Sequence, residues 1–163
     1  MLSTIATAAW SSPTIDYHAL APEMILGAGI VVLLLLDLFL SDSRKWLLTP
    51  VASFTLLGAF IPVLTLALSN SGTRQMFDGR YVIDDFSLVM KGMFLLSGYV
   101  VVLLAADYIR EGDYYQGEFW FLMLSSLMGM VMMASSRDLI SIFVALEFLS
   151  IPAYMLAAWR KRD

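Results

Sequence analysis

Five long apolar runs, separated by short polar breaks, constrain this chain more than any other feature. A helix needs about 20 mostly apolar residues to cross the hydrocarbon core of a bilayer. The runs are continuous and do not alternate in polarity, which favours helices over the strands of a membrane barrel. We therefore predict an all-α membrane protein, a single membrane domain over residues 1–163 with about five transmembrane helices. These helices are expected at residues 20–40, 46–68, 86–106, 119–136 and 139–159.

Composition supports a membrane location and excludes several other classes. Hydrophobic residues make up 60% of the chain and charged residues 15%, whereas soluble domains carry about 25% charged residues. The surplus apolar surface cannot be hidden inside a core of this size, so it faces lipid. There is no cysteine and one histidine, His18, which argues against metal, haem and iron–sulfur sites on this chain. The net charge of −4 makes nucleic acid an implausible partner.

Positive charges in the loops predict how the chain crosses the membrane. With the N-terminus outside and the C-terminus cytoplasmic, six Lys and Arg residues fall on the cytoplasmic side and three on the outer side. Trp46 and Trp159 then lie at the cytoplasmic interface, where indole rings are common. The polar breaks carry turn residues, among them Gly72 and Gly79, and Asp138 is placed to cap the fifth helix.

Three ionisable residues fall well inside the apolar runs: Asp37, Lys91 and Glu147. Charged groups at such depths are rare and commonly functional. Glu147 lies eight residues beyond Leu139, about 12 Å into a helix of roughly 30 Å, and cannot reach either surface. A carboxyl group there is neutral when isolated and charged beside a cation, which is the property of a proton carrier; a structural carboxyl bonded to another helix is the alternative. Asp37 is expected at the interface.

Other residues near these charges are candidates for the same site. Ser150 and Tyr154 follow Glu147 at i+3 and i+7, on the same helix face, and predict a polar path. Pro152 removes a helical N–H and predicts a kink just past Glu147, with a packing role as the alternative. Lys91 lies about 7.5 Å below the end of its helix. It either extends outward to the interface or pairs with a carboxylate inside the bundle, Glu147 being one candidate.

Several motifs together resemble a known family. Leu-Glu-x-Leu-Ser-x-Pro-x-Tyr occupies positions 146–154, and Gly-Glu-Phe-Trp occupies 117–120. Asp-Phe-Ser at 85–87, with Lys91 following, and Ala-Pro-Glu-Met at 21–24 complete the pattern. The sequence resembles the antiporter-like membrane subunits of NADH:quinone oxidoreductase (respiratory complex I), in particular subunit N, the counterpart of mitochondrial subunit 2. The resemblance covers nearly the whole chain.

The resemblance implies a non-redox subunit of a translocase, which couples electron transfer from NADH to quinone to proton transport. It implies fourteen helices, of which this chain would be the N-terminal third, inactive alone. It also implies that Glu147 is the acidic half of a Glu–Lys pair whose lysines lie on later helices. No cofactor or metal is expected here; NADH, flavin, iron–sulfur and quinone sites belong to other subunits. The expected partners are other membrane subunits, lipid and protons, in a bacterial inner membrane.

Two other functions stay open from the sequence. One is a subunit of a multisubunit cation/proton antiporter or of a membrane-bound hydrogenase, relatives that share the glutamate of the fifth helix. The other is a truncated, non-catalytic assembly or scaffold piece, an interpretation that the end of the chain at Asp163 suggests. Co-purification with NADH-oxidising partners would favour the NADH:quinone oxidoreductase subunit over the antiporter subunit.

Overall fold

Five α-helices and a small β-hairpin make up the computed structural model, which describes residues 15–69, 72–111 and 116–158. Five helices are long and apolar enough to cross a membrane, which confirms the predicted all-α membrane fold. The orientation across the membrane stays a prediction, and Trp159 and residues 160–162, on which it partly rests, lie outside the described residues. The elements are α1 (Ala21–Phe39), the 3-10 helix η1 (Asp42–Leu47), α2 (Leu48–Leu68), β1 (Arg74–Met76), β2 (Tyr81–Ile83), α3 (Asp85–Glu111), α4 (Gln116–Ser135) and α5 (Leu139–Ala158).

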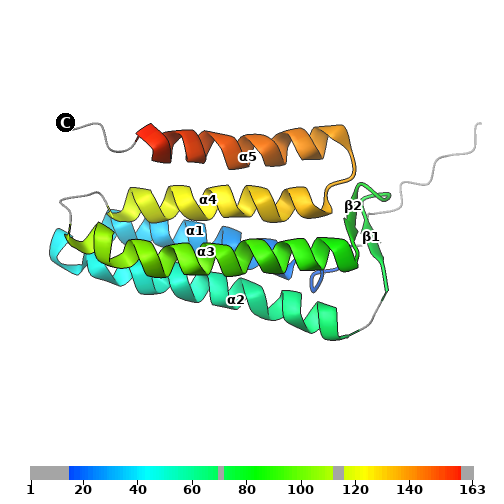
Figure 1. Ribbon diagram of the computed structural model, residues 1–163, viewed down its shortest axis with the longest axis horizontal. Coiled ribbons are helices and arrows are strands. Elements are labelled where there is room, and N and C mark those ends of the chain that lie inside the picture. The colour runs from blue at the N-terminus through cyan, green and yellow to red at the C-terminus, as the bar shows by residue number, and fades with distance from the viewer. Residues whose placement is uncertain (1–14, 70–71, 112–115, 159–163) are drawn as a thin grey trace, which may run out of the picture.

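The first four helices form a closed bundle, and the fifth lies outside it. In the bundle α1 packs against α2, α2 against α3, α3 against α4, and α4 against α1. The helix α5 runs along the outer side of α4, and the hairpin covers the end of the bundle at which α3 begins and α4 ends (Figure 1). The candidate site on α5 is therefore at the edge of the described structure.

Large apolar side chains lie both inside the bundle and on its outer faces. Leu33, Leu56 and Trp120 are among the fully buried core residues, whereas Phe54 and Leu104 are more than two-thirds exposed. Water-soluble proteins of this size do not expose apolar residues along every helix. The outer faces fit contact with lipid or with further transmembrane helices.

The segment between α2 and α3 contains a hairpin that the sequence did not predict. Its strands pair antiparallel, with Met76 opposite Tyr81 and Arg74 opposite Ile83. Its turn places Phe77, Asp78 and Gly79 at positive φ values of 53°, 56° and 80°, and only the glycine adopts such a conformation without strain. Strands of three residues are not stable alone, so this hairpin depends on its contacts with the helices.

The helix ends agree with the apolar runs except at the link between α3 and α4. There α3 continues to Glu111 and α4 begins at Gln116, because the polar residues that end an apolar run still favour helix outside the membrane. The predicted cap on α5 is confirmed: the backbone N–H of Ser141 donates to Asp138 Oδ2 at 3.3 Å. Hydrogen bonds from Ser141, together with the positive charge of Arg80, hold the pKa of Asp138 below its usual value.

Candidate functional site

Glu147 lies near the middle of α5, on the side away from α4. The buried residues Ala145 and Pro152 mark the face that packs on α4, where Ser126 Oγ donates to the carbonyl of Leu149 at 3.2 Å. Two residues along an α-helix differ in direction by about 200°, so Glu147 points away from the face marked by Ala145. Its side chain is partly exposed.

The close approach of α4 and α5 explains why the other face is the open one. Gly129 of α4 meets the backbone of α5 so closely that a Cβ atom there would lie 2.5 Å from the nitrogen of Leu149 and 2.8 Å from the carbonyl oxygen of Ala145. Small residues at such crossings let helix backbones come together. The contact fixes the rotation of α5 and so the direction of Glu147.

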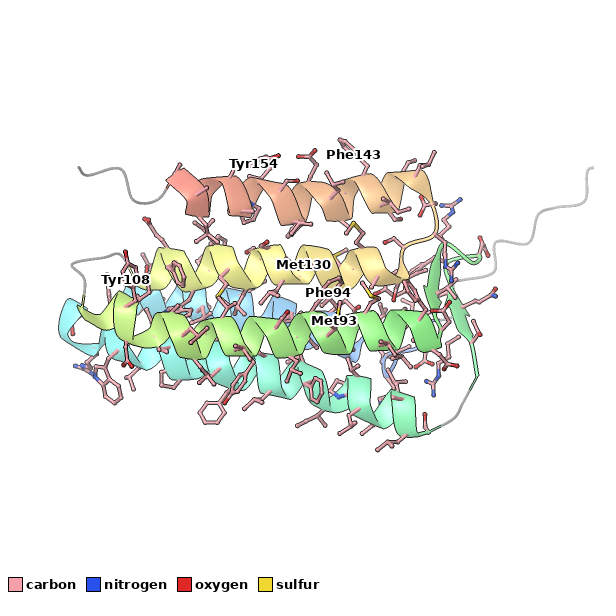
Figure 2. The ribbon with its side chains drawn as sticks, in the orientation of Figure 1. Met93, Phe94, Tyr108, Met130, Phe143 and Tyr154 are labelled. Carbon is pink, nitrogen blue, oxygen red and sulfur yellow. The ribbon has the colours of Figure 1, made fainter. Side chains whose placement is uncertain are left out.

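The side chains on the same face as Glu147 also turn outward. Figure 2 shows Phe143 and Tyr154 on the side of α5 away from α4, and they are 62% and 73% exposed. Ser150 donates its hydroxyl hydrogen to the carbonyl of Leu146 in its own helix. Among the described residues Glu147 has no hydrogen-bond or ion-pair partner. A polar path through Ser150 and Tyr154 stays a prediction.

Pro152 is buried against α4, and α5 runs without interruption from Leu139 to Ala158. The proline has no N–H, so the carbonyl of Phe148, four residues earlier, loses its helical donor. Phe148 also lies at the crossing, with its carbonyl carbon 2.8 Å from the Cβ position of Gly129. A packing role for Pro152 is thus visible, and its contribution to a proton path stays a prediction.

Lys91 is wholly buried, and its partner is Glu23 of α1. The ammonium group lies 2.7 Å from Glu23 Oε1, and the hydroxyl of Tyr81 donates to the same oxygen at 2.5 Å. Lys91 Nζ also lies 3.2 Å from the Tyr81 hydroxyl oxygen and 5.2 Å from the centre of its ring. Burial and the Glu23 carboxylate raise the pKa of Tyr81, which keeps the phenol protonated and able to donate. We call these three residues the ionic cluster.

The ionic cluster confirms one of the two predictions for Lys91, a pair with a carboxylate inside the bundle, and corrects the candidate partner. The side chain is 0% exposed, so it does not extend outward to the interface, and its ion pair is with Glu23 and not with Glu147. The reason is geometric: α5 lies on the other side of α4 from α3 (Figure 1). Glu147 lies on the face of α5 that is turned away from α4. Glu23 was not predicted as the partner of Lys91, because its position at the start of the first helix did not mark it as a buried charge. The sequence feature that could have indicated this pair is that Glu23 and Lys91 both lie near the same end of the bundle.

Asp37 lies near the end of α1, at the end of the bundle opposite the hairpin. Its carboxylate is 3.7 Å from the ammonium group of Lys45, and both side chains are partly exposed. It also contacts Gly117, in the first turn of α4, where the free N–H groups of a helix favour a negative charge. These contacts hold the charge of Asp37 at this end of the bundle, and its place at the membrane interface stays a prediction.

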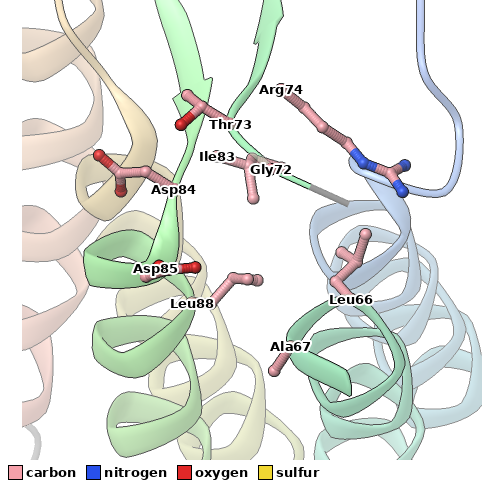
Figure 3. Close-up of a pocket in the computed structure, with 9 residues that line it drawn as sticks. All are labelled: Leu66, Ala67, Gly72, Thr73, Arg74, Ile83, Asp84, Asp85 and Leu88. Carbon is pink, nitrogen blue, oxygen red and sulfur yellow. The ribbon is translucent and has the colours of Figure 1, made fainter. Parts of the chain in front are cut away.

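A polar hollow of about 140 Å³ lies at the hairpin end, between the end of α2 and the start of α3 (Figure 3). Two charged side chains at its rim point away from it: Arg74 pairs with Asp16 at 2.7 Å, and Asp84 pairs with Arg137 at 2.5 Å. In the described ranges, no three His, Cys, Asp or Glu side chains gather as a metal site would require. The hollow is a recess between these two ion pairs.

Comparison with known proteins identifies the family. No family model matches the chain. Curated relatives do: NADH-quinone oxidoreductase subunit N of Geobacillus kaustophilus is 36% identical over 154 residues, or 93% of this chain, and that of Thioalkalivibrio sulfidiphilus is 32% identical over 146 residues, or 90%. NAD(P)H-quinone oxidoreductase subunit 2 of Synechococcus elongatus is 36% identical over 156 residues, or 91%. The resemblance predicted from the motifs is thereby confirmed. This multi-pass membrane chain belongs to the family of NADH-quinone oxidoreductase subunit N and its counterpart subunit 2, and it spans 30% of the length of these relatives.

Proposed function

We propose that the full-length protein is the proton-translocating membrane subunit of an NADH:quinone oxidoreductase and that Glu147 carries the proton in this part of it. The observation that carries the proposal is the position of Glu147, in the middle of a 20-residue apolar helix and on the face away from α4. Ionisable groups at this depth are rare and mark transport sites. The names of the relatives indicate the reaction to which proton transport would be coupled, the oxidation of NADH by quinone.

In this mechanism the charge state of Glu147 follows its electrostatic surroundings. The carboxyl group holds a proton while no cation is near, and it releases the proton when a cationic side chain approaches. That cation belongs to a later part of the full-length protein. Ser150 and Tyr154 extend the polar face, and the carbonyl of Phe148, freed by Pro152, is an acceptor for a water molecule.

The proposal includes the placement of the chain and its partners. The N-terminus and the hairpin lie on the outer side of a bacterial inner membrane, and the chain is the N-terminal third of a fourteen-helix subunit. The subunit is itself non-redox: NADH, flavin, iron–sulfur clusters and quinone bind other subunits of the complex. The relatives named above support this function over an antiporter or hydrogenase subunit and over a scaffold piece.

The test is Glu147→Gln in the full-length subunit within the assembled complex. This change keeps the shape of the side chain and removes its ability to ionise, so NADH-driven acidification of inverted membrane vesicles should fall at least tenfold at an unchanged amount of complex. Glu118→Gln is the matched control, because Glu118 is exposed in the first turn of α4 and should pump normally. Normal pumping by the assembled Glu147→Gln variant would reject Glu147 as the proton carrier.

A further inference from the structure

The ionic cluster places charged groups in the buried interior of the bundle, and the proposed function does not use it. Its members come from three elements: Glu23 from α1, Tyr81 from β2 and Lys91 from α3. Glu23 is 7% exposed and Lys91 is 0% exposed. An unpaired charge in such surroundings is strongly unfavourable, so the pair holds α1 and α3 in one register.

Tyr81 connects this pair to the hairpin in two ways. Its hydroxyl donates to Glu23 Oε1 at 2.5 Å, and its ring lies beside the Lys91 ammonium group. Its backbone meanwhile forms a β-bridge with Ser136, in the link between α4 and α5. One residue therefore joins the buried charges to the link.

Two further bonds hold the link against the hairpin. The backbone N–H of Arg137 donates to the carbonyl of Arg80 at 2.8 Å, and the Arg137 guanidinium pairs with Asp84 at 2.5 Å. The helix α5 begins two residues later, at Leu139. A continuous set of bonds thus runs from the ionic cluster through the hairpin to the start of the helix that carries Glu147.

We infer that Glu23, Tyr81 and Lys91 are positioning residues: their ion pair fixes the hairpin on the α4–α5 link and so sets the position of α5 against the bundle. The inference about geometry stands without the proposed function. Its consequence for pumping rests on the role proposed for Glu147. Without the ion pair, the hairpin and the start of α5 should shift relative to each other and the pumping rate should fall.

The experiment measures that geometry in the full-length subunit within the assembled complex. Spin labels are placed at Gln75→Cys, exposed on β1, and at Ile140→Cys, exposed at the start of α5; these 163 residues contain no other cysteine. The test variant is Glu23→Gln with Lys91→Met, because this double change leaves no unpaired charge and should insert normally. Its distance distribution should be at least twice as wide as that of the parent, with at least a twofold loss of pumping.

Two controls separate the outcomes. Lys45→Met removes a lysine that pairs with Asp37 at the other end of the bundle, and it should leave the distance distribution narrow. Glu147→Gln should also leave the distribution narrow while lowering pumping at least tenfold. Normal pumping by that variant would refute the proposed function and leave the geometric test intact. A double variant as narrow as the parent would overturn the positioning role. A double variant that is broad but pumps normally would overturn its consequence for pumping.

Discussion

The crossing of α4 and α5 at Gly129 makes a quantitative prediction. A Cβ atom at Gly129 would lie 2.5 Å from Leu149 N, 2.8 Å from Ala145 O and 2.8 Å from the carbonyl carbon of Phe148. All three are backbone atoms, and ordinary contacts with a Cβ atom are 3.4–4 Å. Gly129→Ala must therefore push α5 away from α4 as a whole, because no side chain can turn aside.

The magnitude follows from two opposed effects. Overpacking of this kind costs about 1–3 kcal/mol, while replacing a mid-helix glycine with alanine stabilises a helix by about 0.5–1 kcal/mol. Gly92→Ala in α3 is the matched control, since its Cβ atom would meet only Phe60 Cε2 at 3.8 Å and Val63 Cγ1 at 3.9 Å. The helix term cancels between the two variants, which leaves a difference of about 1–3 kcal/mol.

Thermal unfolding of the purified chain in detergent micelles measures this difference. For chains of about 150–250 residues, 1 kcal/mol shifts Tm by about 2–4 °C. We expect Gly129→Ala to unfold about 2–12 °C below Gly92→Ala. Equal Tm values for the two variants would show that α5 does not lie against α4 at this distance, and would also remove the argument for the outward direction of Glu147.

Three further predictions concern the ends and the core of the bundle. Glu23→Gln and Lys91→Met should each destabilise the chain by about 3–5 kcal/mol in a denaturation series, and the double variant by much less than their sum; additive losses would contradict a charge pair. Hydrogen bonds to its carboxylate and its pairing with Arg74 lower the pKa of Asp16 against the effect of desolvation. The stability it contributes is therefore present above its usual pKa of 3.8 and lost as pH falls below that value; Asp16→Asn should flatten the acid limb of a Tm-against-pH curve. Gly98→Ala should lower Tm less than Gly129→Ala, because the nearest atoms are leucine methyl groups that can move.

The helices could be predicted from the sequence because lipid imposes a length and an apolar composition on each spanning segment. The hairpin could not, because its three-residue strands carry no periodic signal and its stability comes from contacts far apart in the chain. Tyr81 contacts Glu23, 58 residues earlier, and Ser136, in a later link. No local pattern of residues encodes such contacts.

The candidate site could be predicted from the sequence only in part. Glu147 stands out from the sequence because depth in an apolar run is a property of one helix. The partner of Lys91 depends instead on how α1 and α3 pack, and on the depth of Glu23 at the start of α1. Charges that are buried by neighbours, and not by their own helix, are visible only in the folded structure.

The place of α5 outside the closed bundle has a consequence for how the protein assembles. All the buried residues of the apolar core cluster precede Leu139, so the interior of the four-helix unit is complete before the fifth helix has left the ribosome. The fifth helix adds one packed face to that unit and leaves its other face, which carries Phe143 and Tyr154, open for lipid or for another helix.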